Sequence, residues 1–526
     1  MGRPGARIQH DNKEITMEGF RHATLLSALV LLSACGGGGG GGSSSPATTW
    51  QAGQFADAGQ FANQCLRPRS GNQYPDVAGL VLDENNWLRA WSHETYLWYD
   101  EILDRNPGNH DNPLAYFDLL KTEAITASGT PKDQFHFTIP SDEWNAQSQS
   151  GVALGYGMQW VIVDPSLPRD VRVAYHDQQD RPDLPPRGAR LLSVDGVSME
   201  WSNDVDTLNA GLFPTQEDEQ HKFEFKYPDD SRHIITLAAE AITSEPVQKV
   251  QVLTSAGGKR VGYMLFNDHI ATAEKALLEA VEQLQQGNDI DELVLDLRYN
   301  GGGYLALASQ LSYMIAGPAR TAGQAFEISR FNDQHPQINP VTDQPLTPTP
   351  FYNATLGFSV PASEPLPNLN LSRVFVLTGA TTCSASESII NGLRGVDVEV
   401  IQIGDRTCGK PYGFYPTDNC GTTYFTIQFQ GVNAKGFGDY PDGFVPGADD
   451  GQAGVQGCQV ADDYDHDLGN IDEARLATAL HYIDNGYCPS TVSRHALGRS
   501  LTAPPIDDGR VHKALWRENR IMTPTR

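Results

Sequence analysis

Basic residues are scarce in this sequence, and their scarcity limits the possible partners. The 526 residues include 38 Lys and Arg against 65 Asp and Glu, which gives a formal charge of −27. A chain with this balance repels polyanions, and no basic patch interleaved with aromatic residues offsets the repulsion. We therefore expect no nucleic-acid partner, and solubility is the simplest explanation of the acidic excess.

The spacings typical of metal sites are also missing. No C-x-x-C motif or histidine pairing accompanies the seven cysteines, so a zinc site is not indicated. The acidic run 462–467 lacks the glycine that a calcium loop needs at its sixth position, where Leu468 stands. We expect no metal and no other cofactor, and we expect the acidic run to be a solvated loop.

The N-terminal part is typical of an export signal rather than of a folded domain. Residues 23–32 form an apolar run that is too short to span a bilayer and suits a signal peptide. Leu-Ser-Ala-Cys at 32–35 resembles a lipobox, in which Cys35 would be acylated, and the Gly/Ser tract 36–45 would act as a flexible tether. An ordinary cleaved signal peptide is the alternative.

Export to an oxidising compartment changes what the other cysteines imply. Six remain after Cys35, and an even number favours disulfides, although the sequence does not choose their pairing. These six are Cys65, Cys383, Cys408, Cys420, Cys458 and Cys488.

An α/β pattern extends over residues 246–490. The predicted strands are 261–266, 293–297, 374–377 and 398–403, and the predicted helices are 272–284 and 305–315. Repeated strand-helix units indicate a sheet covered by helices.

Two residues of this region, Ser384 and Lys410, form a candidate catalytic pair. Ser384 begins a predicted helix, and Lys410 follows 26 positions later at the end of a predicted strand. A serine hydroxyl needs an adjacent base, and a lysine amine can be that base when a desolvated site lowers its pKa. Two alternatives are that Ser384 is only a helix cap and that Cys383 is the nucleophile.

A third alternative is a phosphate-binding loop. Residues 404–410 match the G-x-x-x-x-G-K pattern of such a loop. The pattern requires Ser or Thr next and a helix after it, whereas this chain has Pro411, with Pro416 close behind. The phosphate-binding interpretation is therefore weak.

The surroundings of the candidate pair resemble the carboxyl-terminal processing peptidases, also called tail-specific proteases. The matching segments are S-A-S-E at 384–387, T-x-G-K at 407–410 and the glycine-rich VLDLRYNGGG at 294–303, in the order that the family has. The resemblance covers roughly residues 80–490. It implies a multi-domain α/β fold with a crotonase-like or ClpP-like core, and a serine endopeptidase that acts on protein or peptide substrates, recognised through their C-termini, without a cofactor.

This resemblance also implies roles for single residues. Ser384 would attack the peptide carbonyl to form an acyl-enzyme, with Lys410 as the general base. The N–H groups of Ala385 and of Gly302, or its neighbour Gly303, would form the oxyanion hole.

Three other residues near the pair are given no chemical role. Asp296 and Arg298 are expected to anchor the glycine loop. The family often has Gln four residues after the lysine, where this chain has Phe414, so the group that orients the base is unassigned.

Short alternating strands are predicted over 149–245, and they suggest a PDZ-like domain. Gly155, Tyr156, Gly157 and Met158 would form the turn that binds a peptide C-terminus through backbone N–H groups. Residues 188–199 would form a strand-turn-strand unit. A generic β-rich module is the alternative.

Other segments complete the predicted organisation. The boundaries are 1–35 for the N-terminal extension and signal, 36–75 for the tether, 76–148 for a helical domain, 149–245 for the PDZ-like domain, 246–490 for the peptidase core and 491–526 for a C-terminal tail. Trp87, Leu88 and Trp91 recur at helical spacing and are expected in a core. The Pro- and Asn-rich segment 332–371 is expected to be an insertion, either a lid or disordered.

Two further functions fit less of the sequence. One is a catalytically silent lipoprotein that binds peptides or hydrophobic ligands on a peptidase-derived fold, and the other is a periplasmic scaffold that acts through the PDZ-like domain alone. Neither explains Ser384 together with Lys410. The expected location is the bacterial cell envelope. The anchor would lie in the outer membrane and face the periplasm, because Gly36 stands where inner-membrane lipoproteins commonly have aspartate.

Overall fold

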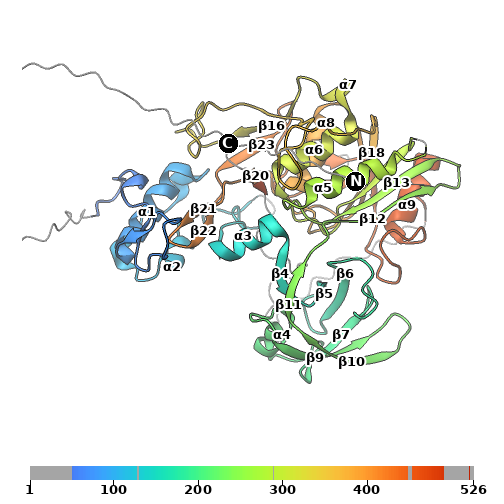
Figure 1. Cartoon of the computed structure of the whole chain (residues 1–526), viewed down its shortest axis with the longest axis horizontal. Helices are drawn as coiled ribbons and strands as arrows, with labels where there is room; N and C mark the ends of the chain where they lie inside the picture. The colour runs from blue at the N-terminus through green and yellow to red at the C-terminus, as the bar shows by residue number, and fades with distance from the viewer. Residues whose placement is uncertain (1–49, 127–128, 288, 448–452, 491–519, 522–526) are drawn as a thin grey trace, which may run out of the picture. The chain divides into compact units, whose positions relative to one another are not determined.

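The computed structural model describes residues 50–126, 129–287, 289–447, 453–490 and 520–521 (Figure 1). The predicted signal, the lipobox and Cys35 lie outside these residues. Among the helices of the described ranges, none combines the length and the apolar character needed to cross a bilayer.

A six-stranded sheet forms the centre of the α/β region. The strand order is β12 (Val247–Thr254), β13 (Arg260–Phe266), β14 (Glu292–Asp296), β18 (Arg373–Thr378), β19 (Glu399–Gly404) and β26 (Gly457–Gln459). Only the β12–β13 pair is antiparallel. Parallel strands are buried on both faces, which explains why their sequences are almost continuously apolar.

Helices cover both faces of this sheet. Residues of α5 (Ala273–Leu284), α6 (Leu305–Ala316) and α8 (Ala385–Gly395) share one hydrophobic cluster with one face, and residues of α9 (Ala474–Asn485) share another cluster with the opposite face. The predicted strands and helices of this region match these elements, and the predicted α/β class is confirmed.

A β-rich region precedes the sheet and has its own hydrophobic core. Its sheet has the order β10-β9-β7-β6-β5, and β8 pairs with β7. Here β5 spans Met158–Asp164, β6 Asp170–His176, β7 Arg190–Val194, β8 Val197–Ser198, β9 Gln220–Lys226 and β10 Arg232–Ala238, with α4 at Val205–Leu212. A separate pair, β4 (Val152–Gly155) and β11 (Glu240–Thr243), joins this region to the neighbouring elements. Strand β5 is therefore an edge strand.

The N-terminal helical part packs on a β-hairpin from late in the chain. It contains α1 (Val81–Thr95), α2 (Pro113–Phe117), α3 (Ser141–Ser150) and the 3₁₀ helices η1 (Ala58–Gln60), η2 (Tyr99–Glu101) and η3 (Pro107–Asn109). Strand β3 (Phe137–Pro140) pairs with β22 (Thr422–Phe425), which pairs with β21 (Thr417–Asn419). Trp87, Leu88 and Trp91 are buried against Tyr424, as predicted for a core stripe.

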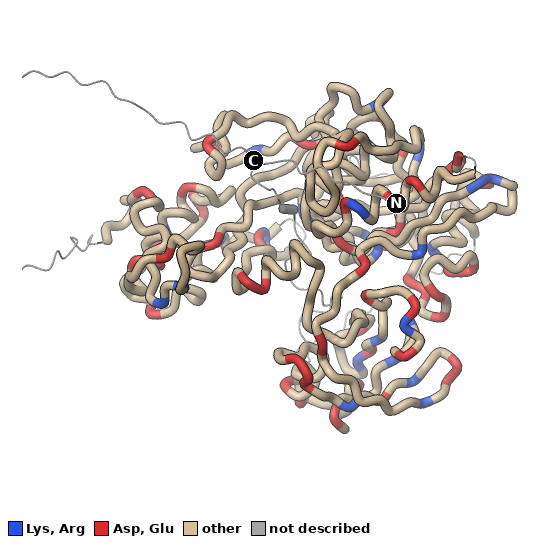
Figure 2. The backbone as a smooth tube through the Cα atoms, in the orientation of Figure 1, with Lys and Arg blue, Asp and Glu red and all other residues tan. Residues whose placement is uncertain are grey.

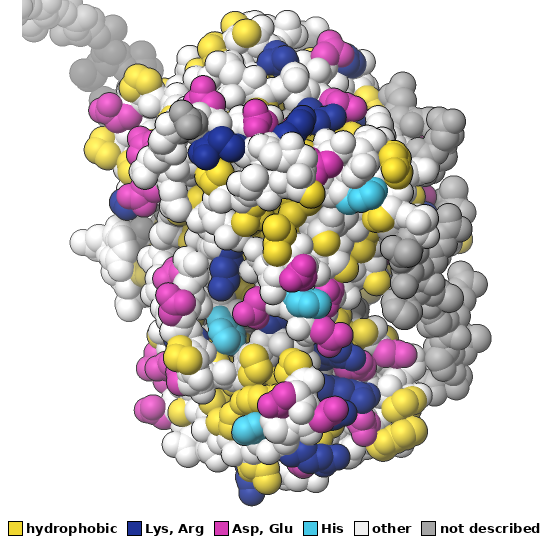
Figure 3. Space-filling view, turned by 90° about the vertical axis from the view of Figure 1, so that its right-hand side faces the viewer, with side chains coloured by type: hydrophobic (Ala, Val, Ile, Leu, Met, Phe, Trp, Pro, Cys, Tyr) yellow, Lys and Arg dark blue, Asp and Glu magenta, His cyan; other side chains and the backbone are white. Residues whose placement is uncertain are grey.

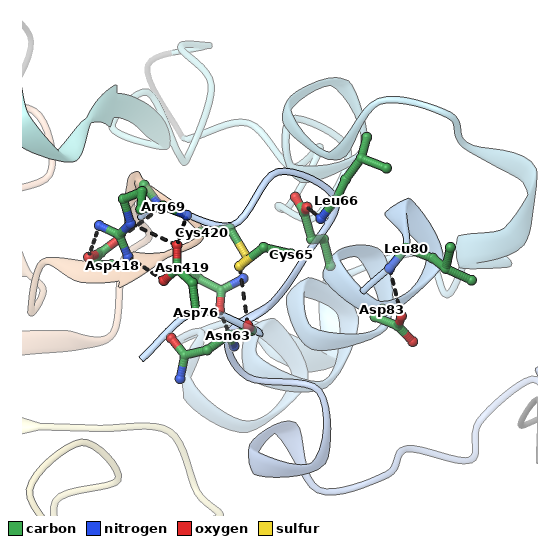
Figure 4. The surroundings of a disulfide bond; sticks show 12 residues. Asn63, Cys65, Leu66, Arg69, Asp76, Leu80, Asp83, Asp418, Asn419 and Cys420 are labelled. Carbon is green, nitrogen blue, oxygen red and sulfur yellow. Dashed lines mark hydrogen bonds and ion pairs between the residues drawn. A yellow bond between two sulfur atoms is a disulfide. The ribbon is translucent and has the colours of Figure 1, made fainter. Parts of the chain in front are cut away.

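The predicted tether 36–75 is wrong in its second half. Residues Gln64 and Cys65 form β1, which pairs with β2 (Val77–Ala78). Cys65 is bonded to Cys420, and Arg69 forms ion pairs with Asp76 and Asp418 (Figure 4). The composition gave no sign of this anchorage, because the disulfide partner lies 355 positions away.

The remaining strands are short. Strands β17 (Thr349–Pro350), β16 (Ala325–Arg330), β23 (Phe429–Val432) and β20 (Tyr412–Gly413) form one sheet in that order, β24 (Val445–Pro446) pairs with β25 (Gly454–Val455), and β15 (Gly303–Tyr304) pairs with β27 (Arg520–Ile521). Helix α7 spans Pro318–Thr321.

The predicted insertion 332–371 packs closely on the α/β region. The buried carboxylate of Glu274, on α5, accepts the backbone N–H groups of Leu356, Phe358 and Ser359. This contact excludes the disordered alternative for the part of the insertion that Glu274 holds.

Charges are distributed over all of the described regions. Acidic positions outnumber basic ones along the backbone (Figure 2). The face in Figure 3 mixes acidic, basic and apolar side chains. The negative charge is therefore spread over the fold, as expected if it serves solubility.

Candidate active site

Ser384 occupies a sharp turn between β18 and α8. Its side chain is fully buried, and its backbone has φ 58° and ψ −111° at the N-cap position of α8. An ordinary N-cap residue has extended backbone angles, and a positive φ is uncommon for a residue other than glycine. Such strain is found where the fold holds a side chain in a functional orientation. Ser384 is the N-cap of α8 and shares a capping box with Glu387, but its positive φ sets it apart from an ordinary cap.

Lys410 is buried next to aromatic rings. It follows β19 in a loop that leads into β20, so no helix succeeds the G-x-x-x-x-G-K segment and the phosphate-loop alternative fails. Its Nζ lies 4.2 Å from the ring centroid of Phe135 and 4.7 Å from that of Phe414. Phe414, which replaces the expected glutamine, thus presents its ring to the amine.

Glu387 connects the two candidate residues. Its Oε2 accepts the backbone N–H groups of Ser384 and Lys410, both at 2.8 Å. Its Oε1 accepts the N–H of Gly409 at 2.9 Å and the hydroxyl of Thr407 at 2.6 Å. Burial raises the pKa of the Glu387 carboxyl, and these hydrogen bonds oppose that rise only in part.

A disulfide forms a second connection between the same two segments. Cys383, directly before Ser384, is bonded to Cys408, two residues before Lys410. Because its sulfur is in this bond, Cys383 has no thiolate with which to act as a nucleophile or to bind a metal beside Glu387. The predicted disulfides are confirmed, since Cys458 and Cys488 form the third pair.

The glycine loop is held against Ser384 by Asn300. The carbonyl oxygen of this buried residue accepts the N–H of Cys383 at 3.1 Å and the hydroxyl of Ser386 at 2.9 Å. Its Oδ1 accepts the N–H of Gly302 at 2.9 Å and Nδ1–H of His269 at 3.0 Å. The Gly302 N–H, a predicted oxyanion donor, is therefore engaged within the loop in this structure.

Of the other predicted oxyanion donors, Gly303 ends this loop and Ala385 begins α8, and both are buried. Gly303 has φ 130°, and a Cβ at this position would lie 2.4 Å from the carbonyl oxygen of His269. Both the backbone angle and the close approach require glycine here.

Buried ion pairs anchor the strand that leads into the loop. Arg298, which is inaccessible to solvent, contacts Asp296 at 2.9 Å, Glu473 at 2.8 Å and Asp462 at 2.7 Å. The predicted anchoring role of Asp296 and Arg298 is confirmed.

The sequence suggested that the acidic run 462–467 is a solvated loop, and this prediction is wrong for Asp462. It also binds Arg187 of the β-rich region at 2.8 Å. Burial would raise the pKa of Asp462, but Arg475, Arg187 and Arg298 outweigh burial and hold the pKa far below its usual value. The pattern of acidic residues in the sequence did not distinguish this partly buried carboxylate from its neighbours.

The predicted carboxylate-binding turn lies at the start of β5. The side chains of Tyr156 and Met158 are buried, and the Tyr156 hydroxyl donates to the carbonyl of Gly211 at 2.9 Å. Gly157, between them, has φ 79°, and its carbonyl accepts the N–H of Asp177, while Gly155 ends β4. This turn would have to bind a ligand through its backbone, since two of its side chains are in the core.

Sequence reasoning missed Glu387, Phe135 and Asn300. Glu387 and Asn300 stood inside quoted motifs, so the signal was present without an assigned role. Phe135 belongs to the N-terminal helical part, and nothing near it in the sequence indicated contact with Lys410.

Comparison with known proteins agrees with this arrangement. Residues 260–415, which include the glycine loop, Ser384 and Lys410, match the model of peptidase family S41. This part of the chain is therefore similar to the S41 peptidases.

Two proteins similar to this chain extend the comparison beyond residues 260–415. A carboxyl-terminal-processing protease of Picosynechococcus sp. is 24% identical over 228 residues, which are 42% of this chain and 45% of that protein. The match thus spans less than half of the relative's own length. The crystal structure of a protein from Bacteroides fragilis, described as a candidate S41 protease, superposes with a TM-score of 0.55 at 22% identity. It covers 80% of this chain and 99% of that one, which shows a shared fold.

Proposed function

We propose that this protein is a serine endopeptidase in which Ser384 is the nucleophile and Lys410 the general base. The observation that carries the proposal is the shared acceptor, Glu387 Oε2, which receives the backbone N–H groups of both residues. The S41 match and the positive φ of Ser384 support it independently.

The reaction would proceed through an acyl-enzyme. Ser384 Oγ attacks the peptide carbonyl carbon while neutral Lys410 takes the hydroxyl proton. The tetrahedral oxyanion then collapses, the C–N bond breaks, and Lys410 returns the proton to the leaving amine. Water, deprotonated by Lys410, hydrolyses the ester and releases the acid. Ala385 and Gly303 are the donors proposed for the oxyanion.

The apolar surroundings of Lys410 suit this role. A lysine can act as a base only after it has lost its proton, and burial away from water favours the neutral amine because it disfavours the charged form. The rings of Phe135 and Phe414 lie against Nζ and shield part of it from water. We infer that these rings replace the orienting glutamine of the family.

Substrate recognition is proposed to use the β-rich region as a PDZ-like domain. Strand β5 is an edge strand and begins at the Gly155–Met158 turn, so an extended peptide could add to it while backbone N–H groups bind its carboxylate. Amidation of a substrate's C-terminus should weaken its binding. Equal affinities for the acid and the amide would remove this role.

We propose that the protein is attached to the bacterial cell envelope through lipid on Cys35, in the outer membrane and facing the periplasm. The short apolar run and the lipobox support this location. Cys35→Ser should release the protein from membranes, and a variant that fractionates with membranes like wild type would contradict the anchor.

Mutation of the pair tests the proposed chemistry. Ser384→Ala, Lys410→Ala and the double variant should each lose about 10³-fold or more of the peptidase activity, without additivity, because residues of one catalytic unit fail together. Lys410→Arg should lose peptidase activity as well, since a guanidinium does not deprotonate. A folded Ser384→Ala protein that cleaves unstructured polypeptide at the wild-type rate would contradict the proposal.

Covalent labelling separates the enzyme from a silent binding protein. A fluorophosphonate probe should label wild type at Ser384, with the labelled peptide identified by mass spectrometry. An unlabelled but folded protein that binds peptides would favour the catalytically silent alternative.

A further inference from the structure

A backbone segment from the C-terminal part of the chain pairs with the strand that follows the glycine loop. Strand β27 lies parallel to β15, with Arg520 opposite Gly303 and Ile521 opposite Tyr304. Gly303 is one of the proposed oxyanion donors. A strand-like peptide is thus seated directly beside the group that would stabilise a reacting carbonyl.

The neighbours of β27 belong to the proposed active site. On its other side, β15 is bridged to His269, so β27 occupies the outer edge of this small assembly. Strand β27 also comes within 8 Å, between Cα atoms, of β20, which begins two residues after Lys410. The segment therefore lies close to both the glycine-loop strand and the strand that follows the proposed base.

Charge favours the same placement. Residues 491–526 contain seven Lys or Arg and three Asp or Glu, whereas the whole chain has a formal charge of −27. The tail is therefore basic and the rest of the chain acidic, so their attraction favours an intramolecular complex.

We propose that the segment containing Arg520 and Ile521 occupies the position of a substrate strand and inhibits the site from within the same chain. The inference rests on the proposed peptidase function. Backbone pairing of an extended peptide with a strand edge tolerates many side chains, so the edge of β15 can accept either the tail or a substrate. The tail then competes with substrate and leaves the chemistry of bound substrate unchanged.

Two variants test the competition. One lacks residues 491–526, and the other, Arg520→Pro with Ile521→Pro, keeps the tail but removes the N–H groups that a β-ladder uses. If the tail fills the site in about nine of ten molecules, each variant should lower KM about tenfold and leave kcat unchanged. The control, Val511→Pro with His512→Pro, changes the same tail outside β27 and should retain the wild-type KM.

A synthetic peptide of residues 515–526 gives a second readout. It should inhibit the truncated protein competitively, and the same peptide with proline at 520 and 521 should not. A wild-type KM in both the truncated and the proline variants would overturn the inference, as would equal inhibition by the two peptides.

Failure of this inference is distinguishable from failure of the proposed function. Ser384-dependent cleavage with no effect of the tail would refute the inhibition alone. If no form of the protein cleaves polypeptide or reacts with fluorophosphonate, the proposed function fails. Binding of the labelled 515–526 peptide to truncated Ser384→Ala protein then still tests the docking, and absence of saturable binding would refute it.

Discussion

Ser384 and Lys410 donate their backbone N–H groups to the same oxygen atom, Oε2 of Glu387, at 2.8 Å each. One buried carboxylate thereby fixes the first turn of α8 against the loop that follows β19. The disulfide between Cys383 and Cys408 joins the same two segments covalently. Two residues 26 positions apart are thus placed by contacts that involve neither of their side chains.

Glu387→Gln should lower kcat by about tenfold or more and change KM little. Glutamine has nearly the same size, but its NH₂ group would face N–H donors, and a buried donor left without an acceptor costs about 1–3 kcal/mol. The measurement is steady-state kinetics with denaturant unfolding on the same preparations.

Glu274→Gln is the matched control. Glu274 is also buried and accepts backbone N–H groups, but from the insertion rather than from the candidate site. This variant should lose a similar amount of stability and keep the wild-type kcat. If both variants keep the wild-type kcat, Glu387 does not position Ser384 and Lys410.

Stability should depend on pH through Glu387, whose pKa burial raises above 4.5. An acid with a raised pKa in the folded state binds its proton more tightly there, so its contribution is fully present below the unfolded-state pKa. The free energy of unfolding of wild type, relative to Glu387→Gln, should therefore fall as pH rises from about 4.5 through the raised pKa. Urea denaturation at a series of pH values measures this difference, and a difference that increases with pH would contradict the assignment.

Removal of the Cys383–Cys408 disulfide should reduce activity beyond its effect on stability. The Cys383→Ala/Cys408→Ala variant should lose about 3 kcal/mol of unfolding free energy, as expected for a loop of this length. We expect at least a tenfold loss of kcat as well, because the segments on both sides of the bond carry Ser384 and Lys410.

Cys458→Ala/Cys488→Ala is the control for loop closure. The two disulfides span 25 and 30 positions, so chain entropy predicts similar losses of stability. Activity of the control variant should be preserved in conditions where it is folded. Equal kinetic losses in the two variants would show that the first disulfide has no special role in the site.

If Lys410 is the base, activity should rise with pH as its amine loses the proton, and Phe414→Leu should shift this rise to lower pH. The ring 4.7 Å from Lys410 Nζ stabilises the ammonium by about 0.5–1 kcal/mol, so its removal should shift the half-maximal pH by about half a unit. Phe425→Leu removes a neighbouring buried ring, 5.1 Å from that of Phe414, and controls for lost packing. Coincident pH profiles for wild type and Phe414→Leu would show that the ring does not act on the amine.

The local pattern of apolar residues was sufficient to predict most strands and helices of the α/β region. Strands β13, β14, β18 and β19 and helices α5 and α6 were all predicted within one or two residues of their ends. The reason is physical, since strands buried on both faces must be apolar throughout and the helices that cover them must be apolar on one side. The tether was mispredicted past Trp50 because composition says nothing about a distant disulfide partner.

The sequence by itself determined the α/β class and the elements that carry Ser384 and Lys410, whereas the structure showed that position 303 requires glycine. Only the tertiary structure decided that Glu387 holds both backbones, that Cys383 pairs with Cys408, and that Phe135 lies over Lys410. The spacing of apolar residues and the local motifs depend on what each segment buries, so they can be recognised in the sequence. Contacts between segments depend on how the strands are ordered in the sheet, and a hydrogen bond, a disulfide or a ring contact forms only once folding has brought its partners together.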